Sequence, residues 1–372
     1  MELSVRKNDL LRELQLFQGI VERKNTIPIL ANVLINANGG GDVQLSATDL
    51  EVGLRSRCPA AIAKTGSLTI PAKKLYEIVR ALPDTDIRIE QGEKGAVKVE
   101  AERFNSRMQT LPREDFPTLP EPGKGVTVAL SRTVFREMVT KTQFAITGED
   151  TRYFLNGALF ILKPDQMDLV ATDGHRLALV TAARGETDDK VDGEIKAILP
   201  KKTLWELARL LADGEGDIRY ERGENHLFFE VDGRQLISRM IDAQFPAFEK
   251  VIPKGNDKRI EFERDRLTSA IKRVALLSSE RSRTVKFQIE KEKVEVTSSS
   301  PEVGEATEVL AVDYTGEPLQ ICFNAQYVLD FLSVADTEAV SLEFKDEMSQ
   351  AVMHPVGGEG FKYTYVIMPM RV

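Results

Sequence analysis

The chain has 372 residues, of which 42% are hydrophobic, 29% charged and 7% aromatic. Because one hydrophobic core seldom organises so long a chain, this length predicts two or three globular domains and excludes a mini-protein. The formal net charge of -8 at pH 7 argues against a simple basic nucleic-acid binder, but it allows one whose charges are sorted by face.

Cysteine, histidine and the amino-terminal segment narrow the class further. Cys58 and Cys322 are too few for a disulfide framework, which fits a reducing compartment. The first residues, MELSVRKNDLL, carry charges where a signal peptide needs an apolar stretch, and no apolar run approaches the roughly 20 residues of a membrane span. The three histidines lack the spacing of metal ligands,. We therefore expect a cytoplasmic protein without a metal or other cofactor.

An internal repeat organises the chain. The segment VQLSATDLEVGLR, which begins at Val43, has a counterpart in MDLVATDGHRLAL, which begins at Met167. Asp49 and Asp173 occupy equivalent positions, and the offset from 49 to 173 is 124 residues, one third of the chain. A weaker third copy, VEVTSSSPEVGEA, begins at Val294. Repetition at one third of the length predicts three similar structural units.

In chain order, each copy begins with one amphipathic helix and contains a second. Apolar residues recur at the i, i+3, i+4, i+7 spacing that buries one helical stripe. The first helices use Leu10, Leu14 and Phe17, then Phe135, Met138 and Val139, then Leu267, Ile271 and Val274; the second use Leu75, Ile78, Val79 and Leu82, then Leu204, Leu207, Ala208 and Leu211, then Val328, Phe331, Leu332 and Ala335. Pro71, Pro200 and Asn324 mark the starts of the second helices, since proline is tolerated in a first helical turn and asparagine caps one.

The segments between and after the helices predict strands. DIRIEQ from Asp86 and DIRYER from Asp217 alternate with period two, which is typical of antiparallel strands with one solvated face. NGGGD at 38–42 is interpreted as a hairpin turn, because the GK[ST] of a phosphate loop does not follow it,. Joints rich in proline, glycine and charge, from Thr118 and from Val251, separate three α+β domains. The predicted domain ranges are 1–122, 126–253 and 257–372.

At this point a family resemblance becomes visible. The repeat, ATDGHRLAL at 171–179, the Phe245-Pro246 step and the terminal YVIMPMRV at 365–372 together resemble the β sliding clamp family of bacterial DNA polymerase III. The resemblance covers the whole chain. It implies three tandem copies of the DNA clamp fold, each with two helices packed on antiparallel sheets, and a head-to-tail homodimer closed into a ring with helices lining the hole.

The same resemblance implies a function. The protein would be a processivity factor without a catalytic site, cofactor or membrane association. It would encircle double-stranded DNA without sequence specificity and hold the DNA polymerase III α subunit there, together with other proteins that carry a clamp-binding peptide. An ATP-dependent clamp loader would open the ring.

A ring around DNA needs basic residues on its helices, and two second helices carry them opposite the apolar stripe. Lys73, Glu77 and Arg80 lie there in the first copy, and Lys202, Glu206 and Arg209 in the second. For any single lysine, a position on a solvated helix face without a role in DNA binding is the better interpretation. With the positions that the resemblance adds, the expected DNA-binding residues are Arg23, Lys24, Lys73, Arg80, Arg152, Tyr153, Phe154 and Lys202. Core packing is the alternative for Tyr153 and Phe154.

The resemblance also implies a cleft that binds partner peptides. Gly174 allows another chain to approach closely, and the terminal methionines form a surface that can repack around different side chains. The expected lining is Leu155, Thr172, Gly174, His175, Arg176, Leu177, Pro246, Lys250, Val251, Val366, Met368, Pro369, Met370 and Arg371. Lys250 and Val372 replace an arginine and a leucine of the family pattern, which changes the expected depth and peptide preference.

Head-to-tail closure requires two different surfaces, one from each end of the chain. The resemblance implies that Met108 and the strand around Arg103 face Leu276 and Leu277 of the partner. Lys74 would pair with Glu302 or Glu305. Ser106 stands where the family pattern has an aromatic anchor, which weakens the expected interface.

Two other functions compete with the ring. One is a monomeric peptide-binding adaptor of DNA metabolism that uses the same cleft without encircling DNA. The other is an enzyme that uses Asp173 and His175, but no GxSxG, second histidine or cysteine nucleophile is placed to join them. Asp49 and Asp173 are instead predicted to be turn residues whose side chains bond nearby backbone.

Overall fold

The computed structural model describes residues 1–21, 26–92, 95–123, 125, 127–148, 150–185, 189, 191–279, 283–358 and 360–371. The chain forms two compact units. The first consists of Met1–Arg136 and Lys202–Met240, and the second of Glu137–Lys201 and Ile241–Val372. Residues of the predicted middle domain, 126–253, therefore belong to both units, and the bounds of the three domains stay a prediction.

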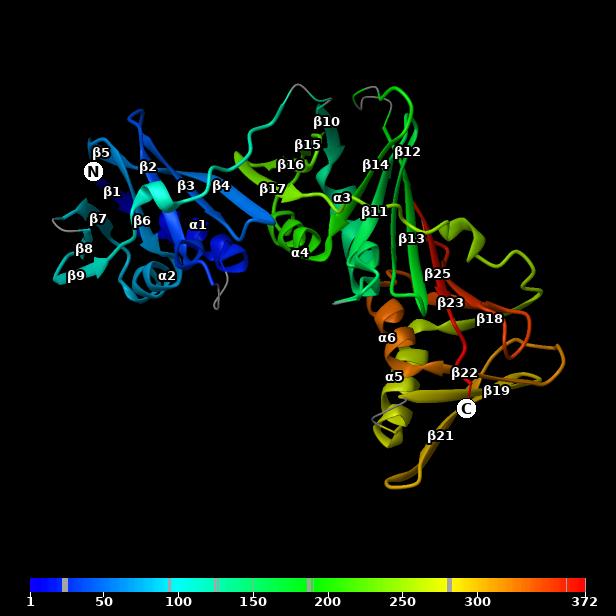
Figure 1. The fold of residues 1–372 in the computed structure, drawn as a ribbon. Coiled ribbons are helices and arrows are strands. Elements are labelled where there is room, and N and C mark those ends of the chain that lie inside the picture. The colour runs from blue at the N-terminus through cyan, green and yellow to red at the C-terminus, as the bar shows by residue number, and fades with distance from the viewer. Residues whose placement is uncertain are drawn as a thin grey trace. The chain divides into compact units, whose positions relative to one another are not determined.

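The first unit contains two antiparallel sheets, one of five strands in the order β5-β1-β7-β8-β9 and one of eight in the order β10-β15-β16-β17-β4-β3-β2-β6. Its helices α1, α2 and α4 lie on one side of the larger sheet (Figure 1). The elements are β1 (Glu2–Arg6), α1 (Lys7–Ile20), η1 (Pro28–Ala31), β2 (Asn32–Ala37), β3 (Asp42–Thr48), β4 (Val52–Pro59), β5 (Ala61–Lys64), β6 (Gly66–Pro71), α2 (Ala72–Ala81), β7 (Asp86–Gln91), β8 (Ala96–Ala101), β9 (Phe104–Gln109), η2 (Arg113–Asp115), β10 (Thr127–Ser131), α4 (Lys201–Leu210), β15 (Asp217–Arg222), β16 (His226–Val231) and β17 (Arg234–Arg239).

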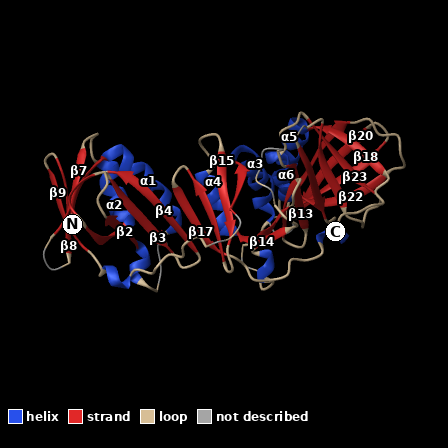
Figure 2. Ribbon diagram, turned by 90° about the horizontal axis from the view of Figure 1, so that it is seen from above, coloured by secondary structure: helices blue, strands red, loops and turns tan. Residues whose placement is uncertain are grey.

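The second unit contains an eight-stranded antiparallel sheet in the order β14-β11-β12-β13-β25-β24-β23-β18 and a four-stranded one in the order β21-β20-β19-β22. Helices and strands of this unit are distinguished by colour in Figure 2. The elements are α3 (Arg132–Thr142), which begins in the first unit, η3 (Gln143–Ala145), η4 (Tyr153–Leu155), β11 (Gly157–Leu162), β12 (Gln166–Thr172), β13 (Arg176–Ala183), β14 (Ile195–Pro200), η5 (Phe248–Lys250), β18 (Lys258–Glu263), α5 (Arg264–Val274), η6 (Ala275–Leu277), β19 (Thr284–Glu290), β20 (Lys293–Ser300), β21 (Gly304–Ala311), β22 (Leu319–Asn324), α6 (Ala325–Val334), β23 (Ala339–Phe344), β24 (Ala351–Val356) and β25 (Phe361–Ile367).

The local signals in the sequence are confirmed. Helix α2 follows directly on Pro71 and α4 on Pro200, while the Asn324 side chain accepts a hydrogen bond from the Gln326 amide at 2.9 Å and so caps α6. The predicted helical stripes are buried apart from Ile78 and Ala208, which are partly exposed.

The hairpin at 38–42 is also confirmed, because antiparallel strands β2 and β3 flank it. Gly39, Gly40 and Gly41 have φ values of 89°, 101° and 88°, a backbone region that favours glycine over residues with a side chain.

Each eight-stranded sheet joins strands of different repeats. In the first unit β17 pairs with β4, with Leu236 opposite Leu54. In the second unit β13 pairs with β25, with Leu177 opposite Val366. These pairings bury the apolar side chains of both strands and bring distant segments of the chain together in the middle of each sheet,.

Candidate functional site

An apolar cleft of about 260 Å³ opens on the second unit. Its lining combines exposed and buried side chains: Arg152, Phe154, Leu155, Thr172, Gly174, His175, Arg176, Leu177, Pro246, Phe248, Val251, Val366 and Met368. Leu177, Phe248 and Val366 also belong to a buried apolar cluster, so the floor of the cleft is part of the core. Val251 and Met368 remain 39% and 37% exposed and can contact a ligand without disturbing that core.

The turn between β12 and β13 shapes one wall. The Asp173 carboxylate accepts hydrogen bonds from the His175 and Arg176 amides at 2.9 and 3.0 Å. In the first unit Asp49 accepts from the Glu51 amide at 2.9 Å in the same way. The prediction that these aspartates are turn residues is therefore confirmed, and their local hydrogen bonds stabilise the turn.

Glycine suits position 174 of this turn for two reasons. Its φ of 88° strains a residue that carries a side chain. A Cβ atom there would also lie only 3.0 Å from the Arg152 guanidinium. Arg152 of the same chain therefore occupies the space beside Gly174.

The opposite wall comes from the carboxyl-terminal strand. Beyond the paired Leu177 and Val366, the Met368 amide donates to the His175 carbonyl at 2.9 Å. This hydrogen bond extends the β13–β25 ladder past the end of β25 and holds Met368 beside the turn. The cleft therefore forms only when segments about 190 residues apart in the sequence pair in register.

Arg176 lies under the cleft wall and is held from several sides. Its guanidinium donates to the Asp330 carboxylate at 2.5 Å, to Asp173 at 3.1 Å and to the Phe144 carbonyl at 2.8 Å. The rings of Phe144 and Tyr327 lie 5.2 and 4.3 Å from it, in cation–π geometry,.

This surrounding keeps Arg176 charged. Burial disfavours the charged form, but Tyr365 and the Asp330 carboxylate outweigh that effect and raise the pKa of the Arg176 guanidinium. Since Arg176 is both the first residue of β13 and a lining residue, helix α6 determines part of the shape of the cleft through Asp330.

The structure places most of the predicted peptide-binding residues around this cleft. The predicted residues that lie outside its lining are Lys250, Pro369, Met370 and Arg371. Lys250 is exposed in η5, and the Met370 amide donates to the Cys322 carbonyl at 2.8 Å, which directs the chain end toward β22. Val372 lies outside the described residues.

Three lining residues were not predicted for the cleft. Phe248 is the first large apolar residue after the Phe245-Pro246 step, so its position in the sequence could have indicated it. Arg152 and Phe154 were predicted to bind DNA. Hydrogen bonds from Arg152 lower the pKa of the Asp150 carboxyl to about 2, and they hold the guanidinium at the rim of the cleft. Phe154 packs against the apolar cluster beneath.

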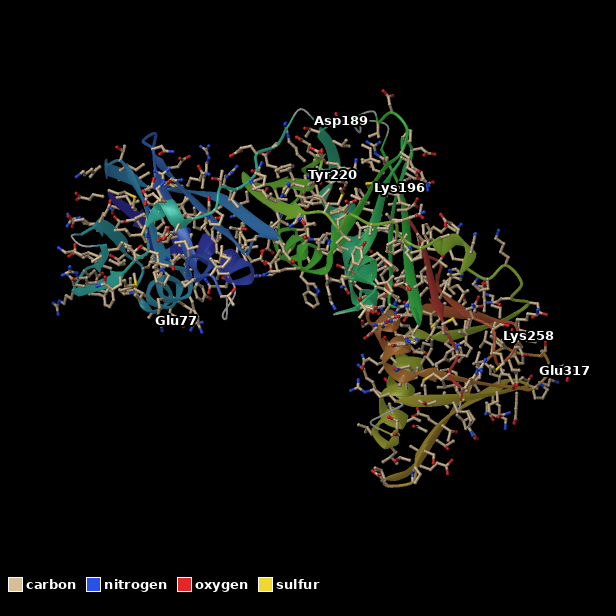
Figure 3. The ribbon with its side chains drawn as sticks, viewed as in Figure 1. Glu77, Asp189, Lys196, Tyr220, Lys258 and Glu317 are labelled. Carbon is tan, nitrogen blue, oxygen red and sulfur yellow. The ribbon has the colours of Figure 1, made fainter. Side chains whose placement is uncertain are left out.

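A second candidate site is the helical face of the first unit. On α1, α2 and α4, which the structure describes completely, the exposed charged residues are all basic: Arg12, Lys73, Lys74, Arg80 and Arg209. The acidic residues of these helices are partly or fully buried: Asp9, Glu13, Glu77 and Glu206. Glu77, labelled in Figure 3, accepts a hydrogen bond from Lys74 at 2.8 Å. The exposed charges of these three helices are therefore basic, although Arg12, Lys74 and Arg209 each pair with one of these acidic side chains.

The other predicted DNA-binding residues have different surroundings. The Lys202 ammonium donates to the Asp49 carboxylate and to the Ile20 carbonyl, so its charge is balanced within the chain. Tyr153 is 58% exposed. Arg23 and Lys24 lie outside the described residues.

Most of the residues predicted for a dimer interface lie on or beside two edge strands. β9 is an edge of the five-stranded sheet and β21 an edge of the four-stranded sheet. Phe104 on β9 is 38% exposed, and Leu276, beside β21, is 79% exposed,. Met108 and Leu277 are partly exposed, and Arg103, Glu302 and Glu305 are exposed. Within the chain Lys74 pairs with Glu77 at 2.8 Å.

Among the described residues, no group of three or more histidine, cysteine, aspartate or glutamate side chains is arranged to hold a metal ion. Over the same part of the chain, no helix is long and apolar enough to cross a membrane.

Comparisons with known proteins cover the entire chain. Family models of the DNA polymerase III beta subunit match residues 1–120 as the N-terminal domain, 129–247 as the central domain and 249–371 as the C-terminal domain. The beta sliding clamp of Pseudomonas putida is 38% identical over 377 residues, and that of Escherichia coli 33% identical over 375 residues, each over 100% of both chains.

Solved structures agree with these relatives. The DNA polymerase III subunit beta from Pseudomonas aeruginosa has a TM-score of 0.93 at 35% identity, with 100% of both chains covered. A sliding clamp from the same organism bound to griselimycin has a TM-score of 0.92 at 36% identity, again over 100% of both chains.

Proposed function

Since the chain belongs to the DNA polymerase III beta subunit family, the beta sliding clamps, we propose that it is a ring-shaped processivity factor that works in the cytoplasm. The family is an accessory subunit without a catalytic site of its own. The observation that carries the proposal is the agreement in fold with a solved beta subunit over the whole of both chains, at a TM-score of 0.93. Processivity then arises because a polymerase held on the ring rebinds the primer end at high effective concentration.

The proposed ring is a head-to-tail homodimer. Edge strands β9 and β21 belong to the first and the second unit respectively, and two different sheet edges suit a heterologous interface,. Exposed Phe104 and Leu276 support burial of apolar surface there. Phe104 lies two residues before Ser106 and so on the same face of β9, where it can supply the aromatic contact that Ser106 lacks.

The proposed DNA contacts come from the helices. Long basic side chains attract phosphates without contacting the base edges. Such contacts can be exchanged from one phosphate to the next at a low free-energy cost, which allows sliding. The exposed basic residues of α1, α2 and α4 support this role. Arg23, Lys24, Arg152, Tyr153 and Phe154 remain proposed contacts from the family resemblance.

The proposed partner site is the apolar cleft of the second unit. An apolar peptide side chain that fills it contributes roughly 1.5–3 kcal/mol, and exposed Met368 and Val251 can adapt to different peptides. The expected partners are the polymerase III α subunit, the clamp loader and other proteins with a clamp-binding peptide. Lys250, Pro369, Met370 and Arg371 would contribute from outside the lining described above.

Retention on DNA tests the ring. The protein is loaded onto a nicked circular plasmid with clamp loader and ATP, and its retention is measured by gel filtration before and after the plasmid is cut once. We expect retention on the circle and loss from the linear product, because a ring slides off a free end. Equal retention on both forms would contradict the ring and favour the non-encircling adaptor.

Salt dependence tests the helical face. Replacing Lys73 and Arg80 with alanine should reduce the slope of log affinity against log salt by about one unit per lost phosphate contact. Lys196→Ala, on strand β14, is the control, because it removes an exposed positive charge away from the helices. An unchanged slope in the double variant would contradict the assignment of these residues to DNA.

A further inference from the structure

The only tryptophan of the chain, Trp205, lies in the middle of α4 and is 51% exposed. The buried stripe of this helix is already formed by Leu204, Leu207 and Leu210, so Trp205 is not needed to attach the helix to the core. Indole is the largest side chain and is costly to leave in water. Its exposure on this face therefore points to a ligand.

Basic residues flank Trp205 on the same helix, and each also pairs with a carboxylate of the chain, Lys202 with Asp49 and Arg209 with Glu206. Lys202 precedes it by three positions and Arg209 follows it by four, and residues at these spacings are neighbours on a helical surface. The Lys202 ammonium donates to the Ile20 carbonyl at 3.3 Å, and Arg209 donates to the Gln15 carbonyl at 2.8 Å. Both contacts tie α4 to α1, so the indole projects from a helix that is held in place.

The rest of this face has the same sign. The exposed charged residues of α1, α2 and α4 are all basic, which makes the face complementary to a polyanion. An exposed aromatic ring among cations is the combination by which proteins hold single-stranded nucleic acid, with the cations on the phosphates and the ring stacked on a base. In a duplex the faces of each base are covered by its neighbours, so an indole can stack only on an unpaired base.

We propose that Trp205 is a stacking site for an unpaired base of single-stranded DNA that lies along the helical face of the first unit. This inference rests on the proposed function, because it assumes that the face turns toward DNA. It adds a contact with unpaired DNA to a surface whose other residues suit only the sugar–phosphate backbone.

A single tryptophan makes the test direct, because all indole fluorescence reports on this position. The full-length protein is titrated with an oligothymidylate and with a duplex of the same length at low salt. We expect the single strand to quench the emission strongly and the duplex to leave it nearly unchanged.

The affinity of Trp205 variants for single-stranded DNA is measured by the fluorescence anisotropy of a labelled oligothymidylate. Trp205→Ala should weaken binding about 5- to 150-fold, the range expected for loss of one stacked base, whereas Trp205→Phe should retain most of the affinity. Met348→Ala removes an apolar side chain that is 52% exposed outside the helical face and serves as the matched control. Circular dichroism confirms that each variant is folded.

The outcomes separate this inference from the proposed function. Suppose that the protein is retained on circular DNA, that the single strand does not quench Trp205 fluorescence and that Trp205→Ala binds the single strand as tightly as the unmodified protein. The stacking site is then wrong and the ring stands. Equal quenching by the duplex would also overturn it, because the indole would then contact the backbone. Loss of retention on circular DNA with quenching preserved would contradict the ring and support the stacking site.

Discussion

Neutralising Asp330 tests whether helix α6 shapes the peptide cleft. The side chain of Arg176 is only 9% exposed and that of Asp330 22%, and the two are joined by a hydrogen bond of 2.5 Å. Asp330→Asn keeps the size of the side chain but removes the negative charge. The remaining partners of Arg176, Asp173 and the Phe144 carbonyl, then have to balance a largely buried cation.

The magnitude follows from the contacts that are lost and kept. A hydrogen bond to a charged group contributes about 1.5–3 kcal/mol, and stranding a buried charge altogether costs about 3–5 kcal/mol. Because Asp173 still pairs with the guanidinium at 3.1 Å, we expect the lower range. Asp330→Asn should destabilise the second unit by about 1.5–3 kcal/mol. It should also lower the affinity for a clamp-binding peptide several-fold, since Arg176 lines the cleft.

Urea denaturation measures the first effect, and calorimetry with a peptide from the polymerase α subunit measures the second. Asp257→Asn removes the same charge from an exposed pair with Lys258 and should leave stability nearly unchanged, because solvent screens exposed ion pairs. If Asp330→Asn behaved like this control in both assays, the view that α6 holds the cleft through Arg176 would be refuted.

Three further predictions concern the cleft, the dimer and pH. Met368→Ala should lower the affinity for the same peptide about tenfold or more, and it should change the melting temperature little because the side chain is exposed at the rim. Met348→Ala should leave the affinity unchanged. Equal affinities of the two variants by calorimetry would exclude Met368 from the site. Leu276→Asp should give a folded monomer by native mass spectrometry, and a persistent dimer at low concentration would refute the assigned interface. Arg152 lowers the pKa of the Asp150 carboxyl to about 2. This ion pair should therefore be intact above about pH 4 and be lost as the pH falls toward 2. An NMR titration of the Asp150 carboxyl with an ordinary midpoint near 3.8 would contradict the contact.

Short-range patterns determined much of the fold. Proline or asparagine before α2, α4 and α6 identified where those helices begin, because capping depends on a few consecutive residues. The glycines at 39–41 identified a hairpin, and Asp49 and Asp173 identified turns, because a short carboxylate bonds backbone amides two or three residues away. The repeat itself could be read without any structure, since equivalent residues recur at a constant offset.

Only the tertiary structure decided which strands meet and which charges balance. The pairing of Leu177 with Val366 depends on register between remote strands, and alternation along either strand does not specify its partner. The same holds for the ion pair of Lys202 with Asp49 and for the close approach of Arg152 to Gly174. The sequence by itself determined the repeats, helices, turns and family of this protein, because those depend on neighbouring residues. The peptide cleft and the basic face were decided by the folded chain, because they depend on segments that become neighbours only through packing.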